Sequence, residues 1–396
     1  MQIPSFSISG IPKIIFGGAS IQQLPKLMSE FGAKALLITG AHSFTSSNHW
    51  TSLIEGMHKT GIAYEHAMVD GEPSPALVDD LAARYRSAGI DVIVAIGGGS
   101  VLDAAKAVAG LLRIDNSVMD FLEGVGPELP YIGPELPWIA VPTTAGTGSE
   151  ATKNAVLSKQ GHDGFKKSFR HDKLVAKYAV IDPQLLMNCP KSLIAANGMD
   201  AFTQLLESYV STRANPFTDA LAMSGLRAAR DGLLGWYFEE GDVAQHRANL
   251  AYAALLSGIT LAQVGLGSVH GLSAPLGAFF PIPHGVVCGT LVAECTRTNI
   301  ELLRQRMPES DALWRYAHAG KVLANNMKLS EMDGLAVLVD TLTEWTERLE
   351  LPRLGHYGMA KADIPHVVAN CRGSSMKTNP IVLTDDEVTT ILINRI

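Results

Sequence analysis

Residues 91–106 read DVIVAIGGGSVLDAAK and carry the strongest fold signal in the chain. The apolar run 91–96 is typical of a buried strand, three glycines follow it at once, and a helix is expected from Ser100 to Leu112. Glycine lets the backbone turn tightly and approach a ligand, while a helix N-terminus offers free N–H groups and partial positive charge. The stretch lacks the GxGxxG pattern, so it predicts either a phosphate site or merely a tight strand-to-helix turn.

Strands and helices alternate on both sides of this turn. Strands are expected at 34–39, 63–69 and 138–141, and helices at 48–60 and 76–88. Such alternation is typical of a parallel sheet covered by helices on both faces.

The pattern changes to helices alone after about residue 185. The helices expected there span 192–210, 216–234, 243–264, 312–327 and 332–349. We therefore predict two domains, an α/β domain over 1–185 and an all-α domain over 186–396.

Composition narrows the class of protein. The 396 residues carry a net charge of -7 and no basic run, which argues against nucleic-acid or anionic-membrane partners. The four cysteines are scattered without a CxxC pair, and the N-terminus has no basic segment followed by an apolar run. The apolar stretch 250–264 contains polar residues and is too short to span a bilayer. We expect a cytoplasmic protein.

A second glycine-rich loop, PTTAGTGSE at 142–150, follows the strand expected at 138–141. Alone it would more often be structural. In open α/β sheets, however, ligands bind beyond the carboxyl ends of the strands, where the first loop also lies. The two loops together predict a nucleotide-binding cleft.

The helical half contains a possible metal site. Asp200 and Gln204 are four residues apart and so share a helix face, and His270 and His284 follow further along. A carboxylate with two imidazoles is a typical ligand set for Zn²⁺ or Fe²⁺. A histidine on an apolar helix can equally be a hydrogen-bonded core residue.

Together these motifs resemble the iron-containing alcohol dehydrogenase family, which shares its fold with dehydroquinate synthase. They are GGGSVLDAAK at 97–106, PTTAGTGSE at 142–150, GMDA at 198–201, His270 and PHG at 283–285, in the family's order and spacing. The resemblance runs from FGG at 16–18 to NP at 379–380. It implies hydride transfer between a small alcohol or aldehyde and NAD or NADP, in a cleft between a dinucleotide-binding domain and a helical domain. It also implies a homodimer or larger assembly, joined through the segment before Gly17.

The resemblance assigns roles to individual residues. Cofactor contacts fall on Gly40, Ser43, Gly98, Gly99, Ser100, Asp103, Thr143, Thr144, Thr147, Asn154 and Lys166. Metal ligands fall on Asp200, Gln204, His270 and His284, of which Asp200, His270 and His284 are the expected catalytic residues.

The chain departs from the family pattern near the metal. Gln204 and Ala274 stand where the family usually has histidines, the second of them implicated in proton relay. Three protein ligands with an open position still suffice for a catalytic Fe²⁺ or Zn²⁺. Two alternatives stay open: a metal-independent reductase of the maleylacetate-reductase kind, and a lyase like dehydroquinate synthase that regenerates its NAD.

A further departure concerns the choice of cofactor. NAD-using relatives commonly carry an aspartate where this chain has Gly40. Its loss leaves room for a 2′-phosphate, to which Ser43 can donate, although no arginine or lysine stands nearby. We expect NADPH to be tolerated and NAD to remain possible.

The substrate is the least determined feature. Lys153, Lys167 and Arg170 cluster around the matched Lys166. They would either select a small anionic aldehyde or form a solvated face that contacts the cofactor phosphates.

Overall fold

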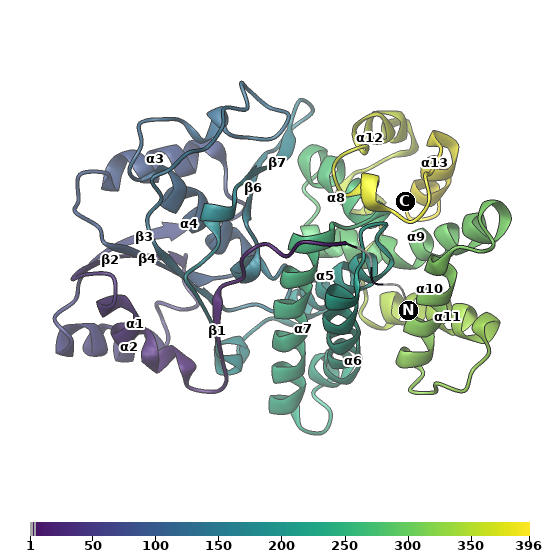
Figure 1. The fold of residues 1–396 in the computed structure, drawn as a ribbon, viewed down its shortest axis with the longest axis horizontal. Coiled ribbons are helices and arrows are strands. Elements are labelled where there is room, and N and C mark those ends of the chain that lie inside the picture. The colour runs from purple at the N-terminus through teal and green to yellow at the C-terminus, as the bar shows by residue number, and fades with distance from the viewer. Residues whose placement is uncertain (1–2, 4) are drawn as a thin grey trace.

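The structure is a computed structural model that describes residue 3 and residues 5–396. An α/β half and a helical half lie side by side, on the left and right of Figure 1. The last strand of the main sheet ends at Ile181 and the first long helix of the second half begins at Lys191.

A six-stranded sheet forms the centre of the α/β half, in the order β1-β8-β5-β4-β2-β3. Every pair of neighbours is parallel, as predicted. The strands are β1 (Lys13–Phe16), β2 (Lys34–Gly40), β3 (Ala63–Val69), β4 (Val92–Gly97), β5 (Trp138–Pro142) and β8 (Tyr178–Ile181).

Helices cover both faces of this sheet. They are α1 (Leu24–Ser29), α2 (Asn48–Lys59), α3 (Pro75–Tyr85) and α4 (Gly99–Leu111). Successive side chains of a strand point to opposite faces, so Ile93 packs in the cluster with α3 and α4, and Val94 in the cluster with α1 and α2. Both faces of β4 are therefore buried, which explains why its sequence is a continuous apolar run.

A two-stranded antiparallel hairpin, β6 (Asn154–Lys159) and β7 (Phe165–Arg170), leaves the main sheet after β5. Ala155, Leu157 and Phe169 are buried against the α/β core, Ser158 is also buried, and the rest of the hairpin is half-buried or exposed. In Figure 1 the hairpin lies at the border with the helical half, toward α8.

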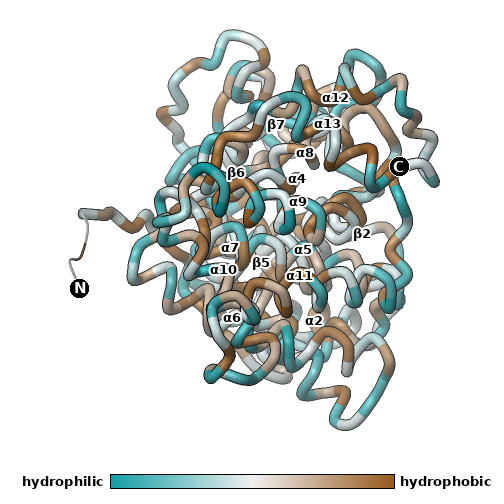
Figure 2. The backbone as a smooth tube through the Cα atoms, turned by 90° about the vertical axis from the view of Figure 1, so that its right-hand side faces the viewer, coloured by the Kyte–Doolittle hydropathy of each residue, from teal (hydrophilic) through white to brown (hydrophobic). Residues whose placement is uncertain are grey.

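Nine helices make up the second half over the residues described. They are α5 (Lys191–Val210), α6 (Pro216–Phe238), α7 (Val243–Val264), α8 (Ser268–Phe279), α9 (His284–Arg306), α10 (Asp311–Leu323), α11 (Glu331–Arg348), α12 (Ile364–Asn370) and α13 (Asp385–Ile393). The α5 helix is buried from Gly198 to Val210 among its neighbours. The tube in Figure 2 is accordingly brown along much of the interior and teal in many outer loops.

No single helix in the described part of the chain is long and apolar enough to cross a membrane. The pair α7 and α8 meets the length and composition criteria only when taken together, and it bends by 99°.

Candidate active site

The two glycine-rich loops lie in contact at the carboxyl ends of β4 and β5. A Cβ atom built on Gly98 would lie 3.3 Å from Thr144 Oγ1, and one built on Gly99 would lie 2.8 Å from Thr147 Oγ1. Gly98 is the N-cap of α4, so free N–H groups of the helix start point into the same region. The structure thus brings together the loops that the sequence predicted as one nucleotide site.

Gly40 and Ser43 lie on the neighbouring strand end. Gly40 is the last residue of β2, one position beyond the Thr39 that pairs with Ile96 of β4. A Cβ on Gly40 would approach Val101 of α4 at 3.9 Å, and Ser43 is exposed in the following loop. Gly40 therefore lies close to the start of α4, and its contact with a cofactor stays a prediction.

The carboxylate of Asp103 accepts hydrogen bonds from other residues of the chain. Its Oδ1 accepts from Ser149 Oγ at 2.5 Å and its Oδ2 from the Val156 amide at 3.1 Å. The buried Lys106 Nζ donates to Ser149 Oγ, Thr152 Oγ1 and the Asn154 carbonyl at 2.7–2.9 Å. These bonds join α4 to the second loop and to β6; a cofactor contact by Asp103 stays a prediction.

Asn154 and Lys166 sit on the hairpin. Asn154 Oδ1 is buried without a hydrogen-bond partner among the described residues, which leaves an acceptor for a polar ligand. Lys166 Nζ pairs with Glu72 at 2.7 and 3.0 Å, and its stem lies 3.6 Å from the Cβ that Gly277 of α8 would carry. Lys166 therefore lies at the border between the two halves.

The second loop also touches the helical half. Gly148 has φ +62°, and a Cβ there would lie 2.4 Å from the Gly258 amide nitrogen of α7. A Cβ on Gly146 would lie 2.8 Å from Asn197 Cβ, one turn before Asp200 on α5. These contacts place the second glycine-rich loop beside α7 and beside α5, the helix that carries Asp200.

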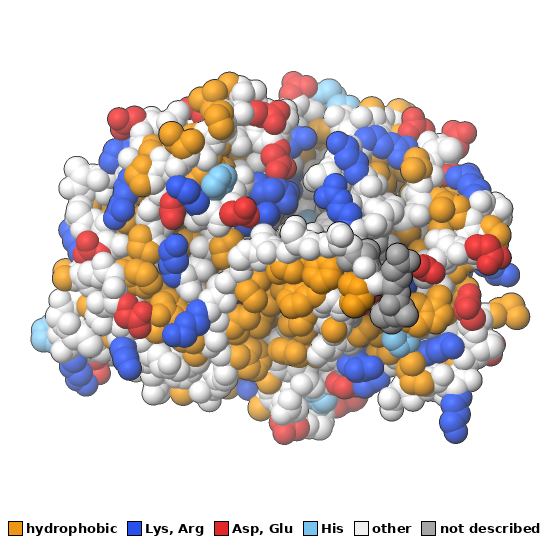
Figure 3. Space-filling view, viewed as in Figure 1, with side chains coloured by type: hydrophobic (Ala, Val, Ile, Leu, Met, Phe, Trp, Pro, Cys, Tyr) orange, Lys and Arg blue, Asp and Glu red, His pale blue; other side chains and the backbone are white. Residues whose placement is uncertain are grey.

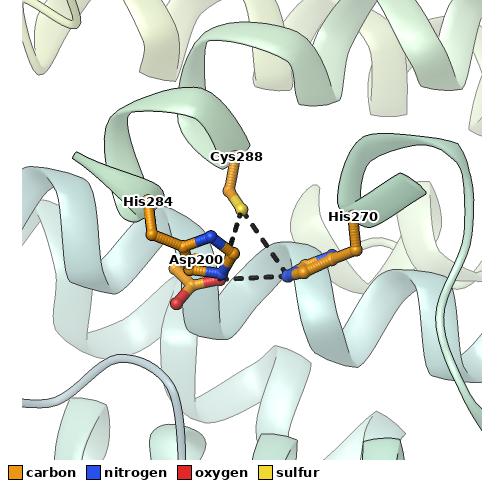
Figure 4. Close-up of side chains that lie close together, drawn as sticks. All are labelled: Asp200, His270, His284 and Cys288. Carbon is orange, nitrogen blue, oxygen red and sulfur yellow. Dashed lines mark hydrogen bonds and ion pairs between the residues drawn. The ribbon is translucent and has the colours of Figure 1, made fainter. Parts of the chain in front are cut away.

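Three predicted metal ligands converge from three helices (Figure 4). Asp200 comes from α5, His270 from α8 and His284 from α9. Asp200 Oδ1 lies 3.2 Å from His270 Nε2 and 3.7 Å from His284 Nε2. Cys288, which the sequence analysis missed, completes a group whose ligand atoms all lie within 4.8 Å of one another.

The local setting of His284 corrects one expectation. None of the helices expected from the sequence includes His284, but it is the first residue of α9, after the N-cap Pro283. Proline suits a helix start because its fixed φ and missing N–H cost little there. His284 and Cys288, one turn apart, therefore face the same side.

Glu207 orients His270 and was also missed by the sequence analysis. Its Oε2 lies 2.6 Å from His270 Nδ1 and its Oε1 accepts from the Val269 amide at 2.7 Å. With Nδ1 donating to this carboxylate, the Nε2 lone pair would be available to a bound metal, the arrangement common among metal-bound histidines. Glu207 and Asp200 are seven residues apart on α5, a spacing that puts both side chains on the same face of the helix.

The charges of the group favour a bound cation. Burial disfavours the ionised form of Asp200, but His284, His270 and Gln204 outweigh it and hold the pKa of Asp200 well below its usual range. Burial lowers the pKa of His284 to about 4, aided by Lys166 and His270 and opposed by Asp200. His284 is therefore neutral at pH 7 and free to act as a ligand.

The groups around His270 also favour a positive charge in the site. Burial lowers its pKa, but Cys288, Asp200 and Glu207 together raise it well above its ordinary value. Without a metal, the negative groups around His270 favour its protonated form. A bound divalent cation would supply this positive charge in place of the proton.

The residues present fit a divalent metal. Asp200 Oδ2 and His284 Nδ1 are buried and have no hydrogen-bond partner in the described part of the chain. Gln204 Oε1 accepts from Ser257 Oγ at 3.4 Å. Ligation by Gln204 stays a prediction, whereas Asp200 and the two histidines already supply a carboxylate and two imidazoles.

Comparisons with known proteins show the family to which the chain is similar. The family model described as iron-containing alcohol dehydrogenase matches residues 12–183, and the one described as Fe-containing alcohol dehydrogenase family, C-terminal, matches 194–396. A long-chain-alcohol dehydrogenase of Geobacillus thermodenitrificans is 30% identical over 357 residues, covering 87% of this chain and 85% of that protein. A 1,3-propanediol dehydrogenase of Klebsiella pneumoniae is 32% identical over 346 residues, covering 85% and 84%. The crystal structure of an archaeal halo-thermophilic Red Sea brine pool alcohol dehydrogenase matches with a TM-score of 0.90 at 25% identity over the full length of both chains.

Proposed function

This chain belongs to the iron-containing alcohol dehydrogenase family, and from that premise we propose that it is a metal-dependent, NAD(P)-linked alcohol dehydrogenase or aldehyde reductase for a small substrate. One observation carries the proposal. Asp200, His270 and His284 converge in a buried group beside two glycine-rich loops that suit a dinucleotide. Figure 3 shows the surface hollowed between the two halves, with Lys and Arg side chains around the hollow.

Different residues of the chain would have different roles in this reaction. A divalent metal would supply Lewis-acid stabilisation of the alcohol or carbonyl oxygen, and the nicotinamide would accept or give the hydride. Asp200, His270 and His284 would hold the metal, and Glu207 fixes the orientation of His270. Asp200, His270 and Glu207 are buried, and the exclusion of water around them would strengthen electrostatic interactions in the site.

The test is a pair of assays on the same preparation. We expect aldehyde-dependent oxidation of NADH or NADPH that is lost after chelation and restored by Zn²⁺ or Fe²⁺. Full activity in the chelated, metal-free protein would instead support the metal-independent reductase. No net oxidation with any aldehyde or alcohol would favour the lyase alternative.

We expect Gly40→Asp to change cofactor preference. A carboxylate at the end of β2 accepts from the ribose 2′-hydroxyl of NAD and repels the 2′-phosphate of NADP. NADPH-dependent kcat/KM should fall about 10²-fold or more relative to NADH-dependent kcat/KM, which corresponds to about 3 kcal/mol. The neutral variant Gly40→Asn is the matched control, because it adds the same bulk without charge. An equal ratio in both variants would contradict the placement of Gly40.

The structure bears on the anionic-substrate hypothesis. Lys153 pairs with Asp172 and Arg170 with Glu123, both at 2.7 Å. Two of the three cationic side chains that cluster around Lys166 are thus already partly neutralised. We therefore favour a neutral small alcohol or aldehyde as the substrate. Higher kcat/KM for a carboxylated or phosphonated aldehyde than for its neutral analogue would reverse this choice.

We also propose a homodimer joined through the N-terminal segment. β1 is an edge strand, and Phe6, Ile11 and Phe16 beside or within it are 41–46% exposed. The orange surface across the front of Figure 3 shows apolar side chains gathered on this face. Exposed apolar patches and open sheet edges commonly mark subunit contacts. A monomer by sedimentation equilibrium at micromolar concentration would contradict the assembly.

A further inference from the structure

Cys288 lies where a ligand of the proposed metal would lie. It is one turn beyond His284 on α9 and is fully buried. Its Sγ is 3.5 Å from His270 Nε2 and 3.8 Å from His284 Nε2. In Figure 4 the thiol points toward the other three side chains from the opposite side of the group to Asp200.

Four of the six separations between the ligand atoms are close to those around a tetrahedral ion, and the other two, Asp200–Cys288 and His270–His284, are within 4.8 Å. Zinc binds nitrogen and oxygen at about 2.0–2.1 Å and thiolate sulfur at about 2.3 Å. In a tetrahedron, two such ligand atoms are about 3.3–3.4 Å apart when both are N or O, and about 3.6 Å apart when one is sulfur. The oxygen–nitrogen distances here are 3.2 and 3.7 Å, and the sulfur–nitrogen distances are 3.5 and 3.8 Å. Four side chains thus already surround a centre of the right size.

A second observation, on the side chain of Asp200, points to an ion at this site. Asp200 is fully buried, yet its Oδ2 has no hydrogen-bond partner among residues 3 and 5–396. Buried carboxylate oxygens are normally satisfied, and an exception calls for an unseen ion or water. The orphaned oxygen belongs to the same carboxylate whose Oδ1 faces His270 and His284.

The other buried cysteines do not share this setting. Cys371 donates to the Val368 carbonyl on its own helix at 3.2 Å. Cys295, two turns beyond Cys288 on α9, is also fully buried but stands outside the group of ligand atoms. An ordinary core cysteine behaves as a small apolar side chain, whereas the polar neighbours of Cys288 are the histidines of the site.

Gln204 explains why an additional ligand is needed. The family resemblance places a histidine at this position, and a neutral amide oxygen is a weak replacement. A cysteine on α9 would restore the count of four protein ligands from a different helix. The substrate oxygen would then bind as a fifth ligand, an expansion that catalytic zinc sites allow.

We propose that Cys288 is the fourth protein ligand of the metal centre and that the set Asp200, His270, His284 and Cys288 selects zinc over ferrous iron. This inference rests on the proposed metal-dependent function. On binding, the Cys288 S–H bond breaks, a sulfur–metal bond forms, and the proton leaves to solvent. Thiolate and carboxylate together balance the two positive charges of the ion. Thiolate is a soft ligand that favours zinc, and Zn²⁺ binds more tightly than Fe²⁺ to most ligand sets.

The test uses the full-length protein loaded with Co²⁺ as a spectroscopic probe. The wild type should show an intense near-ultraviolet thiolate-to-cobalt charge-transfer band, Cys288→Ser should lose it, and Cys295→Ser should keep it. X-ray absorption of the zinc form should show a sulfur neighbour at about 2.3 Å in the wild type and in Cys295→Ser only. Zinc affinity should fall about 10²–10³-fold in Cys288→Ser, one ligand's share of a typical four-ligand site.

A second variant guards against misfolding. Adding Gln204→His to Cys288→Ser should restore zinc affinity without restoring the charge-transfer band. One Co²⁺ per chain without that band in the wild type, or zinc affinity unchanged in Cys288→Ser, would overturn the ligand assignment and leave the dehydrogenase proposal standing. Tighter binding of Fe²⁺ than of Zn²⁺ would overturn the metal preference alone. Failure of every variant to bind metal, with activity intact, would overturn both proposals.

Discussion

Asp200→Asn is expected to reduce kcat/KM by at least about 10³-fold. The carboxylate is the one anionic oxygen ligand among Asp200, His270 and His284, and it is fully buried between the two histidines. A neutral amide keeps the shape but loses the charge that holds a divalent cation. Loss of Lewis-acid stabilisation removes several kcal/mol from the transition state, and about 4 kcal/mol corresponds to 10³-fold in rate.

The measurement compares kcat/KM and bound metal in the same preparations. Asp219→Asn is a suitable control, because Asp219 lies on α6, outside the site. Its Oδ1 forms an ion pair with Arg315 Nη1 of α10 at 2.7 Å. The control should keep its metal and most of its activity. Wild-type activity in a metal-depleted Asp200→Asn variant would refute the role of the metal.

Gly99→Val is expected to raise the KM for the dinucleotide by at least about 10²-fold. Gly99 is the first residue of α4, and even a single Cβ would lie 2.8 Å from Thr147 Oγ1. A branched side chain would therefore fill the space between the two loops and keep a pyrophosphate from the N–H groups of the helix. Each hydrogen bond to a charged group contributes about 1.5–3 kcal/mol, so the loss of two accounts for this factor.

The control is Gly373→Val, at a position where a Cβ meets nothing within 4 Å and φ is not positive. Titration of NADH and NADPH fluorescence gives the binding constants directly. Unchanged cofactor binding in a folded Gly99→Val protein would remove the first loop from the cofactor site.

The sequence was most informative where burial is complete. β2 and β4 are covered on both faces, and their apolar runs identified them. β1 and β8 have only four residues each, and β1 is largely exposed, so neither produced a clear pattern. The hairpin of β6 and β7 was missed because its burial pattern does not alternate clearly along most of its length.

The helical half shows a similar limit. α8 contains Pro275 and several glycines and serines, which are typical of loops, and tertiary packing overrides them. Because α8 and α9 were not expected, the one-turn spacing of His284 and Cys288 could not be used.

The residues of the proposed metal site were identified by two kinds of evidence. Asp200, His270 and His284 could be named from motif spacing and family resemblance, and the structure brings them together. Cys288 and Glu207 become visible only in three dimensions, because their roles depend on how α5, α8 and α9 pack.

Metal content per chain, measured by mass spectrometry, tests the central claim most directly. The protein should be purified anaerobically, without chelator and without a nickel affinity step. We expect about one zinc or iron ion per chain in the wild type, bound by the buried Asp200 group. Absence of metal, with aldehyde-dependent NAD(P)H oxidation intact, would contradict the account and identify a metal-independent reductase.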